Sequence, residues 1–134
     1  GRAMERNEKT RALLAAFGCA LAYLLAGKAL TAVLPQVPEE AARMWAFVHR
    51  CAAAPIVEEL VFRGAIQQLA RPLGERQAVA LQAVLFAVQH RGPAGMAYAL
   101  VCGLVLGTIR SRTGSVWPGM LLHTLNNLLV FAAG

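Results

Sequence analysis

The longest apolar run of the chain extends from Ala12 to Leu34 and contains one charged residue, Lys28. At a rise of about 1.5 Å per residue, a helix of this length crosses the hydrocarbon core of a bilayer. A basic segment precedes the run, as in signal peptides, but the run is longer than a signal sequence requires and no A-x-A-like cleavage site follows it. We therefore predict a leading transmembrane helix over residues 12–34.

The amino-acid composition is also typical of a membrane protein. The chain of 134 residues is 57% hydrophobic and 15% charged, whereas soluble domains contain about 25% charged residues. The net charge is +6, but the basic residues lie at segment ends without interleaved aromatics, so we expect no nucleic-acid partner. We expect one domain over residues 1–134, embedded in the lipid bilayer. The Ala-, Leu- and Arg-rich composition favours a bacterial inner (cell) membrane.

Four further apolar segments lack the strict alternation of strands, which favours helices. They are residues 44–69, with a break near Pro55, and residues 77–90, 96–109 and 116–133. The predicted fold class is therefore all-α, a polytopic transmembrane bundle of about five helices with an interior polar site. Residues 44–133 are expected to form the helical core that carries this site.

Loop charges predict the orientation of such a bundle. With five spans, the basic amino-terminal residues and the basic turns at residues 71–76 and 110–112 lie on one side of the membrane. The opposite side holds Arg43 and Arg91. Because basic residues concentrate on the cytoplasmic side, we expect a cytoplasmic amino terminus.

Three cysteines, Cys19, Cys51 and Cys102, each lie in an apolar run. Their odd number and the absence of a C-x-x-C pair favour neither a disulfide framework nor a zinc knuckle. We interpret all three as small buried hydrophobic residues.

The stretch APIVEELVFRGAI, residues 54–66, places three charges in an apolar segment. Charges in such a setting are costly unless they are paired or functional. Glu59 and Arg63 are four residues apart on one helical face, which predicts an ion pair. Glu58 points about 100° away and would be available as a general base. The alternative is a helix end with solvent-exposed charges.

Three more polar residues lie in or at the end of apolar segments: His90, His123 and Asn127. His90 could interact with a helix carboxyl terminus, and the other two could form ordinary interhelical hydrogen bonds. Polar groups in a bilayer nevertheless seek one another, because lipid offers them no partner. We therefore expect these three residues and Glu58 to meet in one interior cluster.

Such a cluster has the groups needed for peptide-bond hydrolysis. A carboxylate beside a histidine can activate water, and a second histidine with an asparagine can donate hydrogen bonds to an oxyanion. Glu58, His90 and His123 could instead ligate a metal such as zinc and leave one position for water. Both alternatives use the same side chains.

Three motifs follow one another on successive hydrophobic segments. EELVFR (residues 58–63) fits the pattern EExxxR, FAVQH (residues 86–90) fits FxxxH, and HTLNN (residues 123–127) fits HxxxN. In this order they resemble the CAAX protease and bacteriocin-processing family, also called the Abi family, which includes the Ras-converting CAAX endopeptidase. The resemblance covers about residues 52–130, with fewer helices than is usual in that family.

The resemblance implies an intramembrane endopeptidase built as a helical bundle. By the match of the motifs, Glu58 and His90 would activate water, while His123 and Asn127 would form the oxyanion site. The expected substrate is a membrane-anchored protein or peptide, cut near its carboxyl-terminal tail.

Glu59 and Arg63 match the remaining positions of the first motif, which implies that they support the site. The family has been described both as metal-dependent and as metal-free, so zinc stays an alternative cofactor. Two other classes of function use the same polar residues. The first is a non-catalytic membrane immunity or partner-binding protein, and the second is a transporter fragment with Glu58 as a proton relay.

Overall fold

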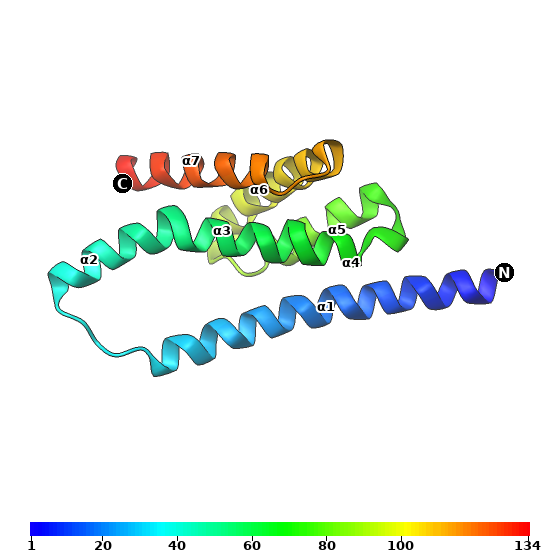
Figure 1. Cartoon of the computed structure of the whole chain (residues 1–134), viewed down its shortest axis with the longest axis horizontal. Coiled ribbons are helices and arrows are strands. Elements are labelled where there is room, and N and C mark those ends of the chain that lie inside the picture. The colour runs from blue at the N-terminus through cyan, green and yellow to red at the C-terminus, as the bar shows by residue number, and fades with distance from the viewer.

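The computed structural model describes residues 1–134 and contains helices and turns but no strand. Five helical units form the molecule, so the predicted all-α fold class is confirmed (Figure 1). The first unit is α1 Arg2–Val33, and the second is a continuous helix made of α2 Glu39–Val48, η1 His49–Ala53, α3 Ala54–Glu59, η2 Leu60–Ile66 and α4 Gln67–Leu69. The 3-10 turn η3 Arg71–Leu73 leads to α5 Glu75–Ala87, α6 Gly92–Thr113 and α7 Trp117–Ala133.

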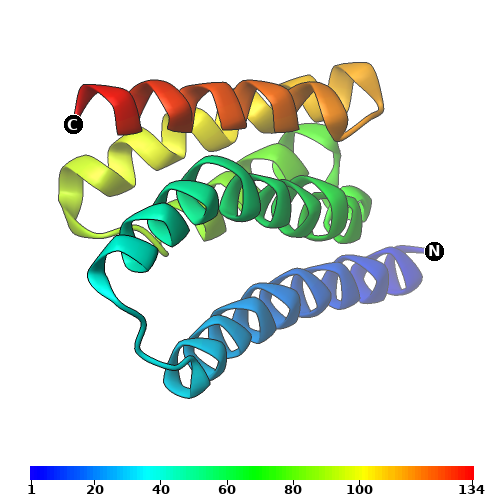
Figure 2. The ribbon, with the colours of Figure 1, turned by 60° about the vertical axis from the view of Figure 1, so that its left-hand side comes forward.

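Helix α1 lies along one side of the other helices and is joined to α2 by a loop (Figure 2). It starts at Arg2 rather than at the predicted residue 12, because its polar first turns are also helical and hold an ion pair between Lys9 and Glu5 at 2.9 Å. It packs through buried small residues at every fourth position, which let helix backbones approach closely in a membrane. These residues are Ala12, Ala16 and Ala20.

The second helix continues through Pro55, where a break was predicted. Ala54 donates its N–H to the carbonyl of His49, five residues earlier, which is the hydrogen-bond pattern of a π-turn. Pro55 follows directly after this wider turn and the helix axis continues. A second π-segment, η2, begins directly after Glu59. The EExxxR motif therefore starts between two π-segments, which are frequent at functional sites.

Helix α6 is longer than predicted, covering Gly92–Thr113 rather than residues 96–109. Pro93 lies in the first turn, where its missing N–H costs nothing. The helix ends only at Gly114, whose φ of 70° is readily adopted by glycine. With 22 residues α6 is long and apolar enough to cross a membrane, as is α1.

Two buried glutamines attach α6 to its neighbours. Gln67 Nε2 donates to the carbonyl of Gly107 at 3.0 Å, and Gln82 Nε2 donates to the carbonyl of Gly103 at 2.7 Å. The glycines allow this approach, since a Cβ on Gly103 would lie 2.9 Å from the Cα of Ala83. These contacts set the position of α6, which forms one wall of the site described next.

Candidate active site

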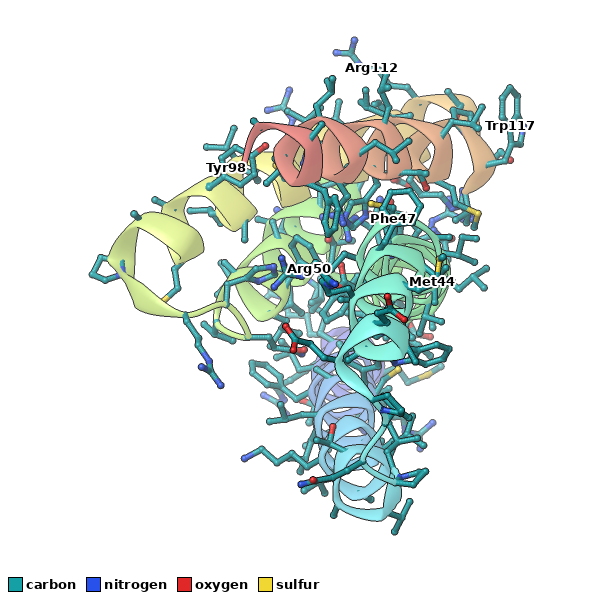
Figure 3. The ribbon with its side chains drawn as sticks, turned by 90° about the vertical axis from the view of Figure 1, so that its left-hand side faces the viewer. Met44, Phe47, Arg50, Tyr98, Arg112 and Trp117 are labelled. Carbon is teal, nitrogen blue, oxygen red and sulfur yellow. The ribbon has the colours of Figure 1, made fainter.

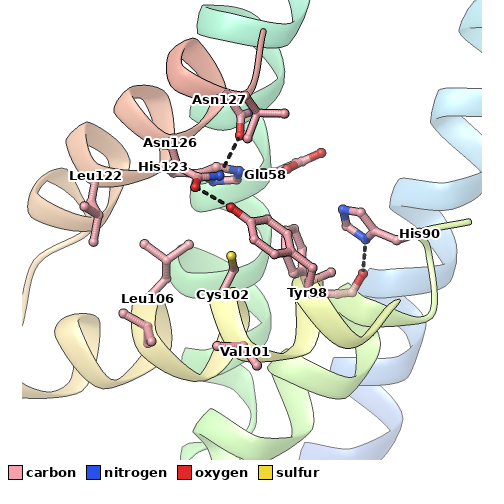
Figure 4. Close-up of a pocket in the computed structure, with 14 residues that line it drawn as sticks. Glu58, His90, Tyr98, Val101, Cys102, Leu106, Leu122, His123, Asn126 and Asn127 are labelled. Carbon is pink, nitrogen blue, oxygen red and sulfur yellow. Dashed lines mark hydrogen bonds and ion pairs between the residues drawn. The ribbon is translucent and has the colours of Figure 1, made fainter. Parts of the chain in front are cut away.

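A pocket of about 390 Å³ lies where α3, α6 and α7 meet the end of α5 (Figure 4). Nine of its 14 lining residues are hydrophobic, so it presents an apolar surface with a few polar groups. The polar residues are Glu58, His90, His123, Asn126 and Asn127. The structure thus brings the four residues predicted as catalytic to one pocket.

His123 lies between two carboxylates. Its Nδ1 is 2.8 Å from Glu59 Oε2, and its Nε2 is 3.4 Å from Glu58 Oε2. The two glutamates are neighbours in sequence, but the Glu59 side chain is 1% exposed and the Glu58 side chain 22% exposed. Glu59 therefore holds the imidazole from the closed side, while Glu58 faces the pocket.

Arg63 neutralises the buried Glu59 carboxylate. Its Nη1 is 3.0 Å from Glu59 Oε2, at ion-pair distance but without hydrogen-bond geometry. The guanidinium also lies over the ring of Phe86, with its Cζ 4.3 Å from the ring centroid, a favourable cation–π arrangement. The ion pair predicted from the spacing of Glu59 and Arg63 is present.

His90 lies just beyond the end of α5. Its Nδ1 is 2.9 Å from the carbonyl oxygen of Phe86, a helix-end carbonyl that also accepts the N–H of Gln89 at 3.3 Å. This is the structural role considered for His90 above, and it leaves Nε2 free. The Phe86 ring centroid is 4.7 Å from that of His90 and 6.0 Å from that of His123. One phenylalanine therefore supports both imidazoles, and the ring of His90 faces the space in front of Glu58 (Figure 4).

Asn127 is held by a backbone carbonyl of the second helix. Pro55 has no N–H with which to continue the π pattern to the carbonyl of Arg50. Asn127 Nδ2 donates to this carbonyl instead, at 2.8 Å. The proline that was predicted to break the helix thus frees the acceptor that orients Asn127. The amide group keeps a second N–H for another partner.

Tyr98 and Asn126 also line the pocket, but neither was predicted as a site residue. The hydroxyl of Tyr98 donates to Asn126 Oδ1 at 2.5 Å and joins α6 to α7 (Figure 4). No motif marks Tyr98. The available signal was a tyrosine within an apolar helix, because its hydroxyl needs a hydrogen-bond partner there.

The three cysteines differ in their surroundings. Cys51 is buried, as predicted, but Cys19 and Cys102 are only partly buried. Cys102 lines the pocket. The prediction that all three are buried is therefore wrong for Cys19 and Cys102, because the faces of α1 and α6 that carry them are not completely covered by other helices.

The zinc alternative does not fit the arrangement of the side chains. No three or more His, Cys, Asp or Glu side chains lie close enough together to hold a metal ion. Nδ1 of His123 is engaged by Glu59 and Nδ1 of His90 by a carbonyl, so each imidazole keeps Nε2, but the two Nε2 atoms and Glu58 do not converge as a ligand set.

The helices of this molecule form a bundle with apolar side chains on its outer surface and a polar pocket between them. Two of the helices, α1 and α6, are long and apolar enough to cross a membrane. These features define a polytopic membrane protein with an interior site. Residues 40–129 match the family model of the type II CAAX prenyl endopeptidase Rce1-like proteins. The match covers most of the chain and all three motifs, and the chain belongs to this family of integral membrane proteases. No curated protein and no solved structure gives a significant match. The predicted family membership is confirmed.

Proposed function

We propose that this protein hydrolyses a peptide bond near the carboxyl-terminal tail of a membrane-anchored protein or peptide. The observation that carries this proposal is the position of Glu58, with Oε2 at 3.4 Å from His123 Nε2 on the wall of a pocket that also contains His90 and Asn127. The apolar lining of that pocket suits the hydrophobic residues of a substrate tail.

Glu58 and His90 are assigned the activation of water. A water held between the Glu58 carboxylate and His90 Nε2 gives its proton to Glu58 as it attacks the scissile carbonyl. The protonated Glu58 then passes this proton to the leaving amine, which restores the carboxylate. The hydrogen bond from His90 Nδ1 to the Phe86 carbonyl orients the ring for this role.

His123 and Asn127 are assigned the stabilisation of the oxyanion. Because the Glu59 carboxylate accepts the Nδ1 proton of His123, Nε2 carries a proton only in the imidazolium form. In that form the ring would lie between two carboxylates, Glu58 and Glu59, and would present an Nε2–H to the pocket. The second N–H of Asn127 Nδ2 is the other donor.

The setting of this reaction is the membrane itself. The composition and the helical bundle are consistent with the inner membrane of a bacterium, where the lipid bilayer would be the constant partner of α1 and α6. The substrate would be bound with its anchor in the same bilayer.

The test uses the full chain purified in detergent and an internally quenched peptide with an apolar carboxyl-terminal segment. We expect hydrolysis by the native protein and a fall in kcat of about 10²–10⁴-fold for Glu58→Gln, because a general base typically contributes this much. The matched control is Glu40→Gln, an exposed glutamate in the first turn of α2, which should keep full activity. Unchanged hydrolysis by a folded Glu58→Gln protein would contradict the proposal and favour the non-catalytic immunity or partner-binding alternative.

A further inference from the structure

A chain of hydrogen bonds runs along the wall of the pocket and joins three helices. The Tyr98 hydroxyl donates to Asn126 Oδ1 at 2.5 Å, and Asn126 Nδ2 donates to Asn127 Oδ1 at 3.4 Å (Figure 4). Asn127 Nδ2 then donates to the carbonyl of Arg50 at 2.8 Å. The chain thus starts at Tyr98, on α6 beside α7, and ends at Arg50 on the second helix (Figure 3).

The last acceptor determines the direction of every hydrogen bond in this chain. A backbone carbonyl can only accept, so the carbonyl of Arg50 requires the NH2 group of Asn127 and turns Asn127 Oδ1 toward Asn126. That oxygen requires the NH2 group of Asn126, whose own Oδ1 then faces Tyr98. A tyrosine hydroxyl can donate or accept, and here it donates. Turning either amide around would place two acceptor oxygens against each other.

This arrangement fixes the free donor of Asn127. Its Oδ1 is held by Asn126 and one N–H of its Nδ2 is held by Arg50, so the planar amide cannot rotate without losing one of these bonds. The second N–H is the donor proposed above for the oxyanion. Such a donor is effective when it is held in place before the reaction starts, because no energy is then spent on reorienting it.

We propose that Tyr98 and Asn126 are positioning residues, which hold the amide of Asn127 in the orientation that stabilises the oxyanion. Neither residue needs to touch the substrate for this role, because Tyr98 acts through Asn126 and Asn126 acts through Asn127. The catalytic part of this inference rests on the proposed function, whereas the hydrogen-bonded chain itself does not.

The hydrogen-bonded chain is tested by nuclear magnetic resonance on the full protein in detergent, with ¹⁵N in its asparagines. The sequence contains three of them, Asn7, Asn126 and Asn127, and the exposed Asn7 in α1 is the internal control. Tyr98→Phe removes the hydroxyl and keeps the aromatic ring. We expect the side-chain NH2 signals of both Asn126 and Asn127 to shift, while those of Asn7 stay in place. Unchanged signals of Asn127 would overturn the proposal.

The role in the reaction is tested with the internally quenched peptide. Tyr98→Phe should lower kcat about two- to tenfold with KM unchanged, which corresponds to the loss of one hydrogen bond. The matched control is Thr108→Val, which removes a hydroxyl of α6 that donates within its own helix, to the carbonyl of Leu104. This variant should keep full activity. A lower unfolding temperature of Tyr98→Phe with unchanged kcat would overturn the proposal, because the chain would then only join α6 to α7.

Two substitutions of Asn126 separate positioning from packing. Asn126→Leu releases Asn127 Oδ1, whereas Asn126→Asp offers an acceptor that draws the free N–H of Asn127 away from the pocket. We therefore expect a larger fall in kcat for Asn126→Asp than for Asn126→Leu, and no further fall from either in an Asn127→Ala background. Equal losses with and without Asn127 would overturn the proposal. If the native protein cleaves nothing, the proposed function fails, while the spectra still decide whether the hydrogen-bonded chain exists.

Discussion

The two sides of His123 show how neighbouring glutamates acquire different roles. On the closed side, Glu59 is paired with Arg63, and both side chains are 1% exposed. On the pocket side, Glu58 keeps a partly exposed carboxylate at 3.4 Å from the other imidazole nitrogen. A buried carboxylate with a fixed cation is suited to hold a ring in place, whereas a carboxylate facing a cavity can exchange a proton.

The difference comes from the helix rather than from the chemistry of the residues. Successive residues of a helix point about 100° apart, whereas residues four positions apart share a face. Arg63 therefore lies on the same face as Glu59 and not on that of Glu58. Gly119 allows α7 to approach the closed side, where an added Cβ would lie 3.2 Å from Glu59 Oε1. The pairing of Glu59 thus leaves Glu58 to the pocket.

The largest effect is expected on the pocket side. Glu58→Gln and His90→Gln should each lower kcat/KM by about 10²–10⁴-fold. The double substitution should lose no more than the worse single change, because residues that act on the same water are strongly non-additive. Steady-state kinetics in detergent measures all three variants, and thermal unfolding should remain close to native. Independent, multiplying losses would show that the two residues do not act as one unit.

The next effect is expected on the closed side and concerns stability. Arg63→Met leaves Glu59 buried without its cation and should lower the free energy of unfolding by about 3–5 kcal/mol. Thermal and denaturant unfolding of the detergent-solubilised protein provide the measurement. The control is Glu59→Gln combined with Arg63→Met, which should lose less than Arg63→Met alone because no charge stays unpaired. Equal losses in both variants would mean that the ion pair is not the cause.

A smaller effect is expected where the second helix orients Asn127. Pro55→Ala supplies an N–H that competes for the carbonyl of Arg50. One hydrogen bond contributes about 0.5–1.5 kcal/mol, so kcat should fall about two- to tenfold with KM unchanged. In an Asn127→Ala background the same substitution should have no further effect. A similar fall in that background would refute the connection between Pro55 and Asn127.

The smallest effect is expected at a carboxylate that belongs to neither side of His123. The hydrogen bond from Ser111 and the nearby Arg71 lower the pKa of the Glu75 carboxyl. Because the pKa of Glu75 is lower in the folded state than in the unfolded state, the ionised carboxylate stabilises the fold. This stabilisation is present at pH values above the ordinary glutamate pKa and is lost as the pH falls through the lowered pKa of the folded state. Ser111→Ala should make the fall of Tm with decreasing pH slightly shallower and leave kcat unchanged. A steeper fall, or a loss of activity, would contradict this assignment.

Several features of the fold and the site could be predicted from the sequence because they depend on local spacing. The helical class follows from the apolar segments, and the ion pair of Glu59 with Arg63 follows from an interval of four residues. The helix ends were predicted less accurately. Helix α6 was expected to cover residues 96–109, but it includes Pro93 in its first turn and continues as far as Gly114.

The contacts that shape the pocket could not be predicted in the same way. The acceptor of Asn127 is a carbonyl that becomes free only because a π-turn precedes Pro55. Tyr98 finds Asn126 on another helix, and no motif connects the two. Both cases join segments far apart in the chain, so they depend on how the helices pack.

By itself, the sequence determined that the chain is a helical membrane protein and which charged and polar residues occupy its apolar segments. These properties arise from composition and from intervals of one to four residues. The tertiary structure alone decided that Glu59 meets Nδ1 and Glu58 meets Nε2 of His123, a residue on another helix. The physical reason is that glycines and buried glutamines set how closely helices approach, and this approach determines which atoms of distant side chains can touch.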